Sequence, residues 1–111
     1  MSASIVLSDR HEWEVKNWIF HQFYDDLRAL YPDDQVLEAY LEQHEPILFD
    51  DFTDNREDAW VARLYYAAAR GIVEGRFATK LNDENVRETY VAALHNLVDL
   101  FEVDGRFTSG L

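Results

Sequence analysis

The stretch DNREDAWVARLYYAAARGIVE, residues 54–74, carries two apolar stripes at helical spacing. Asp54 and Glu57 form a capping-box pattern, so we expect a helix that begins at Asp54 and ends near Glu74. A helix with two apolar stripes packs against more than one neighbour. The first stripe is Trp60, Val61, Leu64, Tyr65, Ala68 and Ile72, and the second is Ala62, Tyr66, Ala69 and Val73.

Three further segments on either side of this one show helical periodicity, and each has local boundary signals. Pro32 and Pro46 disfavour continuation of the two helices that precede them, and Gly105 favours the end of the last helix. No run of alternating strand pattern competes with these segments. The sequence therefore predicts an all-α, four-helix bundle-like fold in a single acidic domain that spans residues 1–111, with helices at residues 9–30, 34–45, 54–74 and 83–103.

The predicted core combines the apolar faces of these helices with one connecting segment. We expect Trp13 to lie on the apolar face of the first helix, together with Phe20. The connector PILFDDF, residues 46–52, is expected to be irregular and to insert Ile47, Leu48 and Phe49 into the core.

Length and composition limit the class of protein. A chain of 111 residues with 48% hydrophobic residues is sufficient for one domain with its own core. The absence of cysteine excludes a disulfide framework, a thiolate zinc site and a cysteine nucleophile. The N-terminal segment lacks the features of a signal peptide, and no apolar run reaches membrane-spanning length. We therefore expect a complete cytoplasmic protein without a membrane segment.

The charge of the chain is strongly negative and unevenly distributed. The 22 acidic and 10 basic residues give a formal net charge of −12, with histidine neutral. Twelve of the acids, and only two of the bases, lie between Asp25 and Asp58. Because phosphate recognition needs a cationic surface, this balance argues against direct binding to nucleic acid or to anionic lipid.

The acidic residues of the second predicted helix are spaced to share one side of it. They recur every three or four residues, opposite the apolar side of the helix. The connector that follows and the end of the first helix add more carboxylates, so we expect one continuous negative surface. The predicted partner-binding residues on it are Asp25, Asp26, Asp34, Glu38, Glu42, Glu45, Asp50, Asp51 and Asp54, together with Trp18.

Trp18 is assigned to this surface because it lies away from the apolar face of the first helix, among polar residues. Tryptophan is enriched at the energetic centres of protein interfaces. The alternative interpretation is that a second neighbouring helix covers its indole ring. Arg56, Arg63 and Arg70 recur every seventh residue, and we expect them to form salt bridges within the domain.

No catalytic, metal-binding or cofactor-binding residues are predicted. A di-metal carboxylate bundle needs Glu-x-x-His pairs, and this sequence contains none. His11 with Glu14, and His95 with Asp99, provide only two ligands each, which do not make a structural metal site. His44 lies on the apolar side of its predicted helix and is interpreted as partly buried.

The negative surface has three interpretations. It serves solubility, it reflects adaptation to a saline cytoplasm, or it docks a strongly basic protein. We predict an acidic protein-binding module that masks a basic partner of the nucleic-acid-processing class. An immunity protein that neutralises a toxin is one form, and an inhibitor of a nucleic-acid-binding complex is another. The alternative is a self-associating structural or regulatory helical subunit whose acids serve solubility only, and for which a homodimer is possible.

Overall fold

The computed structural model describes residues 2–54 and 57–108, and it shows an α+β fold. Within these residues the chain forms four α-helices and a three-stranded mixed sheet. The prediction of an all-α helical bundle was therefore wrong. Residues 11–16, which were predicted to begin a long helix, form a strand instead, and two further strands that were not predicted lie at residues 2–8 and 49–51.

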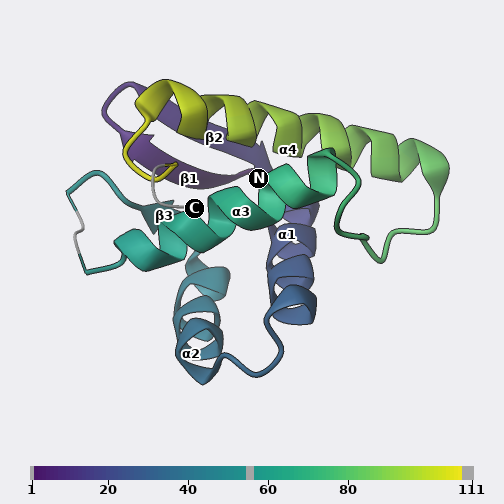
Figure 1. Ribbon diagram of the computed structural model, residues 1–111, viewed down its shortest axis with the longest axis horizontal. Coiled ribbons are helices and arrows are strands. Elements are labelled where there is room, and N and C mark those ends of the chain that lie inside the picture. Colours follow the sequence, from purple (N-terminus) through teal and green to yellow (C-terminus); the bar gives the residue numbers. More distant parts are fainter. Residues whose placement is uncertain (1, 55–56, 109–111) are drawn as a thin grey trace.

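The sheet consists of β1 (Ser2–Ser8), β2 (His11–Lys16) and β3 (Phe49–Asp51), in the order β2-β1-β3. The first two strands form an antiparallel hairpin, in which Ile5 pairs with Trp13. The third strand is parallel to β1, with Ile5 opposite Asp50. The centre of the sheet is thus the N-terminal strand, which pairs with a segment distant along the chain (Figure 1).

The strands form because their side chains alternate between two environments. In β1, Ala3, Ile5 and Leu7 are buried, whereas the alternate residues Ser2, Ser4, Val6 and Ser8 lie on the other face. In β2, Trp13 is buried and its indole Nε1 donates a 2.8 Å hydrogen bond to the Ala93 carbonyl oxygen. An antiparallel hairpin with one solvated face has this period of two. Trp13 therefore reaches the core from a strand and not from a helix.

The observed helices agree with the predictions in part. The second and fourth predicted helices agree with α2 and α4 to within one residue at each end. The first begins at Asn17 and not at residue 9, because residues 9–16 belong to the hairpin. The third begins at Ala59 and not at Asp54. The helices are α1 (Asn17–Leu30), α2 (Gln35–His44), α3 (Ala59–Val73) and α4 (Glu84–Asp104), with a 3-10 turn η1 (Glu45–Ile47).

Local caps explain why α2 and α4 were easy to locate. The Asp34 side chain accepts a 2.9 Å hydrogen bond from the Leu37 backbone N–H, and the Asp83 side chain caps α4 in the same way. Gly105 ends α4 with a φ of 78°, a conformation that glycine adopts without steric cost. The predicted capping box at Asp54 does not start α3, whose N-cap residue is Asp58.

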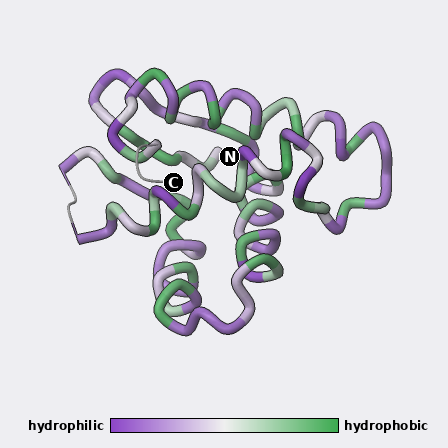
Figure 2. Tube along the Cα trace, viewed as in Figure 1, coloured by the Kyte–Doolittle hydropathy of each residue, from purple (hydrophilic) through white to green (hydrophobic). Residues whose placement is uncertain are grey.

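In the arrangement of Figure 1, α4 runs along the sheet and packs against α3, while α1 and α2 extend away from the sheet as an antiparallel pair. Figure 2 shows hydrophilic residues at the outer turns and hydrophobic residues where the elements meet. The core is rich in aromatic side chains. Those that are fully buried are Phe20, Phe23, Tyr24, Phe52, Tyr65, Tyr90 and Phe101.

The connector after α2 differs from its prediction. Ile47 and Phe49 were expected in the core, but 62% and 41% of their surfaces are exposed. Leu48 is half-buried and packs against the core. Because β3 alternates, it is Asp50 and Phe52 that point inward and are fully buried. In the part of the chain that the structure describes, no helix is long and apolar enough to cross a bilayer.

Candidate functional site

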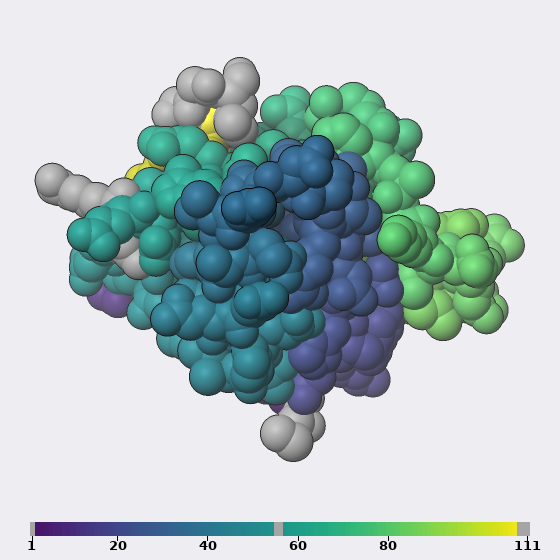
Figure 3. All heavy atoms as spheres, turned by 90° about the horizontal axis from the view of Figure 1, so that it is seen from below, coloured from purple at the N-terminus to yellow at the C-terminus, as the bar shows by residue number. Residues whose placement is uncertain are grey.

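The projecting pair formed by α1 and α2, residues 17–44, is called the α1–α2 hairpin below. Figure 3 views the molecule from below, so this hairpin is nearest to the viewer. It carries the predicted acidic helix face, and η1 follows directly at its end.

A single guanidinium group lies at the centre of the acidic residues. Arg28 on α1 is within 3.3 Å of Asp25, 3.1 Å of Glu38 and 2.8 Å of Glu45. His21, two turns earlier on α1, is 2.7 Å from the Glu45 carboxylate. Three carboxylates thus share one arginine, and the cluster keeps a negative charge even if His21 is protonated.

These contacts determine the ionisation of Glu45. Burial alone would raise the pKa of Glu45, but hydrogen bonds from Arg28 and His21 outweigh this effect, and the pKa is lowered from its ordinary value. For Arg28, burial alone would lower its pKa, but the carboxylates of Glu45 and Glu38 raise it overall. Both groups are therefore charged at neutral pH.

The remaining predicted surface acids lie around this cluster or apart from it. Glu42 on α2 is exposed, and Asp34 is half-buried at the N-cap of α2. Asp51 on β3 and Asp54 are also exposed. Among the described residues, no hydrogen bond or ion pair links Asp51 or Asp54 to Arg28. The structure thus brings together Asp25, Glu38 and Glu45, and does not join the whole predicted set.

Two of the predicted surface acids lie in the core and cannot contact a partner. Asp26 accepts hydrogen bonds from the Tyr90 hydroxyl at 2.7 Å and from Gln22 at 3.1 Å. Asp50 accepts from the hydroxyls of Tyr24 at 2.7 Å and Tyr65 at 3.1 Å. Because Asp26 and Asp50 are buried, their predicted assignment to the negative surface was wrong.

The environment of Asp50 is unusual for a carboxylate. Burial raises the pKa of Asp50 to about 6, although hydrogen bonds from Tyr24, Tyr65 and Tyr40 and the charge of His44 act in the opposite direction. Its Oδ1 atom is buried and has no hydrogen-bond partner among the described residues. Burial also raises the pKa of Tyr24 and Tyr65 well above 10, so both hydroxyls remain donors.

Trp18 lies near the start of α1 with 37% of its surface exposed. It precedes His21 by three residues and therefore shares its side of the helix, which faces Glu45. No ring contact or hydrogen bond is formed by its indole group within the described residues. Of the two interpretations of Trp18, an exposed indole agrees with this position.

The arginines of α3 have different surroundings. Arg70 forms an ion pair of 3.1 Å with Glu74 in the same helix. Arg63 is exposed, and among the described residues no ion pair involves it. Arg56 lies outside the described residues.

Of the two histidine–carboxylate pairs, the structure brings His95 within 3.3 Å of Asp99 but separates His11 from Glu14. His11 and Glu14 are on a strand, so their side chains point to opposite faces. The His11 Nδ1 atom is 2.9 Å from the Ser8 Oγ and 3.9 Å from Asp104. A nucleophilic triad would need the two partners on different ring nitrogens. No group of three or more potential metal ligands occurs in the described part of the chain.

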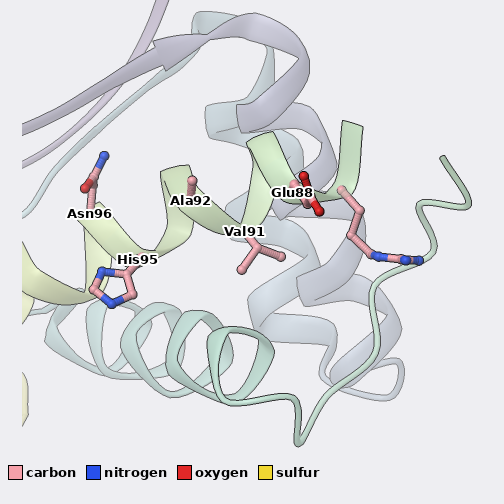
Figure 4. Close-up of a pocket in the computed structure, with 6 residues that line it drawn as sticks. Glu88, Val91, Ala92, His95 and Asn96 are labelled. Atoms are coloured by element: carbon pink, nitrogen blue, oxygen red, sulfur yellow. The ribbon is translucent and has the colours of Figure 1, made fainter. Parts of the chain in front are cut away.

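A shallow hollow of about 580 Å³ lies on the exposed side of α4. Figure 4 shows its lining side chains along one face of this single helix. Val91 and Ala92 lie in the middle of the lining along the helix, and polar side chains lie toward both ends. This face was not predicted, because it combines the partly buried Val91 with exposed small and polar residues opposite the buried stripe. The lining residues are Arg87, Glu88, Val91, Ala92, His95 and Asn96.

Comparison with protein-family models, curated proteins and solved structures finds no match to this chain.

Proposed function

We propose that this protein is an acidic protein-binding module that masks a basic partner of the nucleic-acid-processing class. Such a module would act either as an immunity protein against a toxin or as an inhibitor of a nucleic-acid-binding complex. The proposal places the protein in the cytoplasm. Its contact surface is the α1–α2 hairpin with Glu45 of η1, reduced to the acids that the structure leaves accessible.

The observation that carries the proposal is the excess of carboxylates around Arg28. Asp25, Glu38 and Glu45 share this one guanidinium, and Glu42 adds a further exposed charge on α2. A face used only for internal salt bridges needs no such excess. Arginine or lysine side chains of a partner would supply the missing positive charge.

Trp18 supports docking independently of charge. A partly exposed tryptophan beside a polar cluster gives a large contact area at low entropic cost, which is typical of residues that dominate interface energetics. The acids would then speed the encounter and select a basic partner, while the indole ring would supply affinity.

The test begins with chemical cross-linking and affinity purification from the native source, followed by calorimetric titration of the purified partner. The test needs a variant that reverses acidic charges on the hairpin but leaves the contacts of Arg28 intact. We therefore choose Asp33→Lys with Glu42→Lys, because both side chains are exposed on the hairpin. Asp9→Lys with Glu84→Lys applies the same charge change at exposed positions elsewhere.

The hairpin variant should weaken binding at least tenfold, and the control variant should change it much less. The association rate of the wild-type protein should fall steeply with salt, because the Debye length shortens from about 10 Å at 0.1 M to about 3 Å at 1 M. Equal losses in both variants would assign binding to net charge alone. A partner without a basic surface would overturn the proposal.

A further inference from the structure

The first turns of α4 extend beyond the body of the protein. Every residue from 84 to 89 is exposed, and Figure 3 shows this end of the helix projecting at the side of the molecule. A helical segment without tertiary packing is only marginally stable in water. The projecting end and the hollow beside it therefore form a helix face that a neighbour would stabilise.

The six residues of the hollow are symmetric about its centre. Val91 and Ala92 occupy the middle, and Glu88 and His95 lie at equal distances along the helix on either side. Arg87 and Asn96 occupy the two outer positions. A face that has an acid at one end, an imidazole at the other and small apolar groups between them is complementary to an inverted copy of itself.

We propose that a second copy of this chain packs antiparallel against this face of α4, with a twofold axis that passes between Val91 and Ala92. In this register Glu88 of each copy lies opposite His95 of the second copy, so the pair forms twice. Val91 and Ala92 flank the axis, where their small side chains permit close approach of the helices.

The charges of neighbouring residues add both attraction and repulsion to this contact. His95 already lies 3.3 Å from Asp99 in its own helix, so in the dimer it would be placed between two carboxylates. The register also brings Glu84 to the level of Asp99 of the second copy, which adds a repulsive contribution at each end. A uniformly basic partner would be repelled by Arg87, and a uniformly acidic partner would be repelled by Glu88. An inverted copy of the same face carries groups of both charges.

The size of the face predicts weak association. Residues 87–96 span about 15 Å of helix at 1.5 Å per residue. Stable interfaces bury about 800 Å² per partner, which one short helix face does not reach. We therefore expect a concentration-dependent dimer. It uses α4 and leaves the α1–α2 hairpin free, so it is independent of the proposed function.

Sedimentation equilibrium of the full chain at concentrations up to about 1 mM tests the proposal, since this range detects dissociation constants up to that value. Ala92→Glu places a charge beside the axis and should raise the dissociation constant at least tenfold. Ala39→Glu adds the same charge at an exposed position of α2 and should leave it unchanged.

A reciprocal exchange tests the register. Glu88→Lys and His95→Glu should each weaken the dimer, because Lys then faces imidazole and Glu then faces Glu. The double variant should restore association, since each Lys faces a Glu of the second copy. A wild-type chain that stays monomeric throughout the range would overturn the proposal. So would a dimer that these α4 variants leave unchanged, or a double variant without recovery.

Discussion

The Tyr24 hydroxyl donates a 2.7 Å hydrogen bond to the Oδ2 atom of Asp50, and neither side chain is exposed to solvent. Tyr65 also lies 3.1 Å from both Tyr24 and this oxygen. One carboxylate of β3 thus joins side chains from α1 and α3 at the centre of the protein. This arrangement fixes the position of the α1–α2 hairpin relative to the sheet. The group that does so is a carboxylate, whose charge depends on pH.

The buried carboxylate should make stability depend on pH. The pKa of Asp50 rises from 3.8 to about 6 on folding, so the folded state binds a proton more tightly than the unfolded state. This group's contribution to stability is therefore fully present below pH 4 and is lost as the pH rises through 6. Asp50→Asn keeps an acceptor for the tyrosines and removes the titration.

Urea denaturation of both proteins between pH 4 and pH 7 checks this prediction. The free energy of unfolding of the wild type, minus that of the variant, should fall across this interval. Because both proteins share every other titrating group, parallel profiles would show that Asp50 has an ordinary pKa.

Leu94 and Leu64 should differ in their contribution to stability. Leu94 on α4 is fully buried in the core, so Leu94→Ala should lower the free energy of unfolding by about 2–5 kcal/mol. Leu64 is only partly buried, and Leu64→Ala should cost about 1 kcal/mol. Val103→Ala at an exposed position serves as the control. Thermal or chemical unfolding measures all three, and a larger loss at Leu64 than at Leu94 would contradict the packing described.

Trp18 should matter more for binding than for stability. Trp13 is buried and Trp60 is partly buried, so iodide should quench Trp18 first, and Trp18→Phe should remove this most accessible fraction of the fluorescence. Trp18→Ala should weaken binding of the basic partner by about 2 kcal/mol. Its effect on the melting temperature should be much smaller than that of Leu94→Ala. A comparable loss of stability would assign Trp18 to the core.

Gly71 should not tolerate alanine, although alanine favours helices by about 1 kcal/mol over glycine. A Cβ atom at this position would overlap the Phe77 ring, which packs against α3. Gly71→Ala should therefore destabilise the protein by about 1–3 kcal/mol. In a Phe77→Ala background the same change should be neutral or stabilising. A destabilisation that persists there would point to a cause other than this ring.

The elements that were predicted correctly have boundaries encoded locally. Asp34 and Asp83 cap their helices within three residues, and Pro46 and Gly105 mark where α2 and α4 end. The first helix was extended too far because Trp13 lies seven residues before Phe20, a spacing that also fits a helix face. In β1, the run Ile5, Val6, Leu7 hides the alternation that the serines would otherwise reveal.

The candidate site was predictable only in part for a related reason. Exposure of Glu42 follows from helical spacing within one element. The burial of Asp50 depends on β3, a strand of three residues that exists because it pairs with β1. The grouping of Glu38 and Glu45 around Arg28 depends on how two helices meet. These are contacts between segments distant in sequence, which periodicity does not report.

The parallel pairing of β1 with β3 has a consequence for how the chain folds. Backbone hydrogen bonds from Ser4 to Leu48 and from Phe52 to Val6 join the N-terminus to a segment that follows two complete helices. Contacts over such a separation carry a large loop-closure cost, whereas the β1–β2 hairpin and each helix form locally. We therefore expect the third strand to join the sheet late, when both helices are already in place.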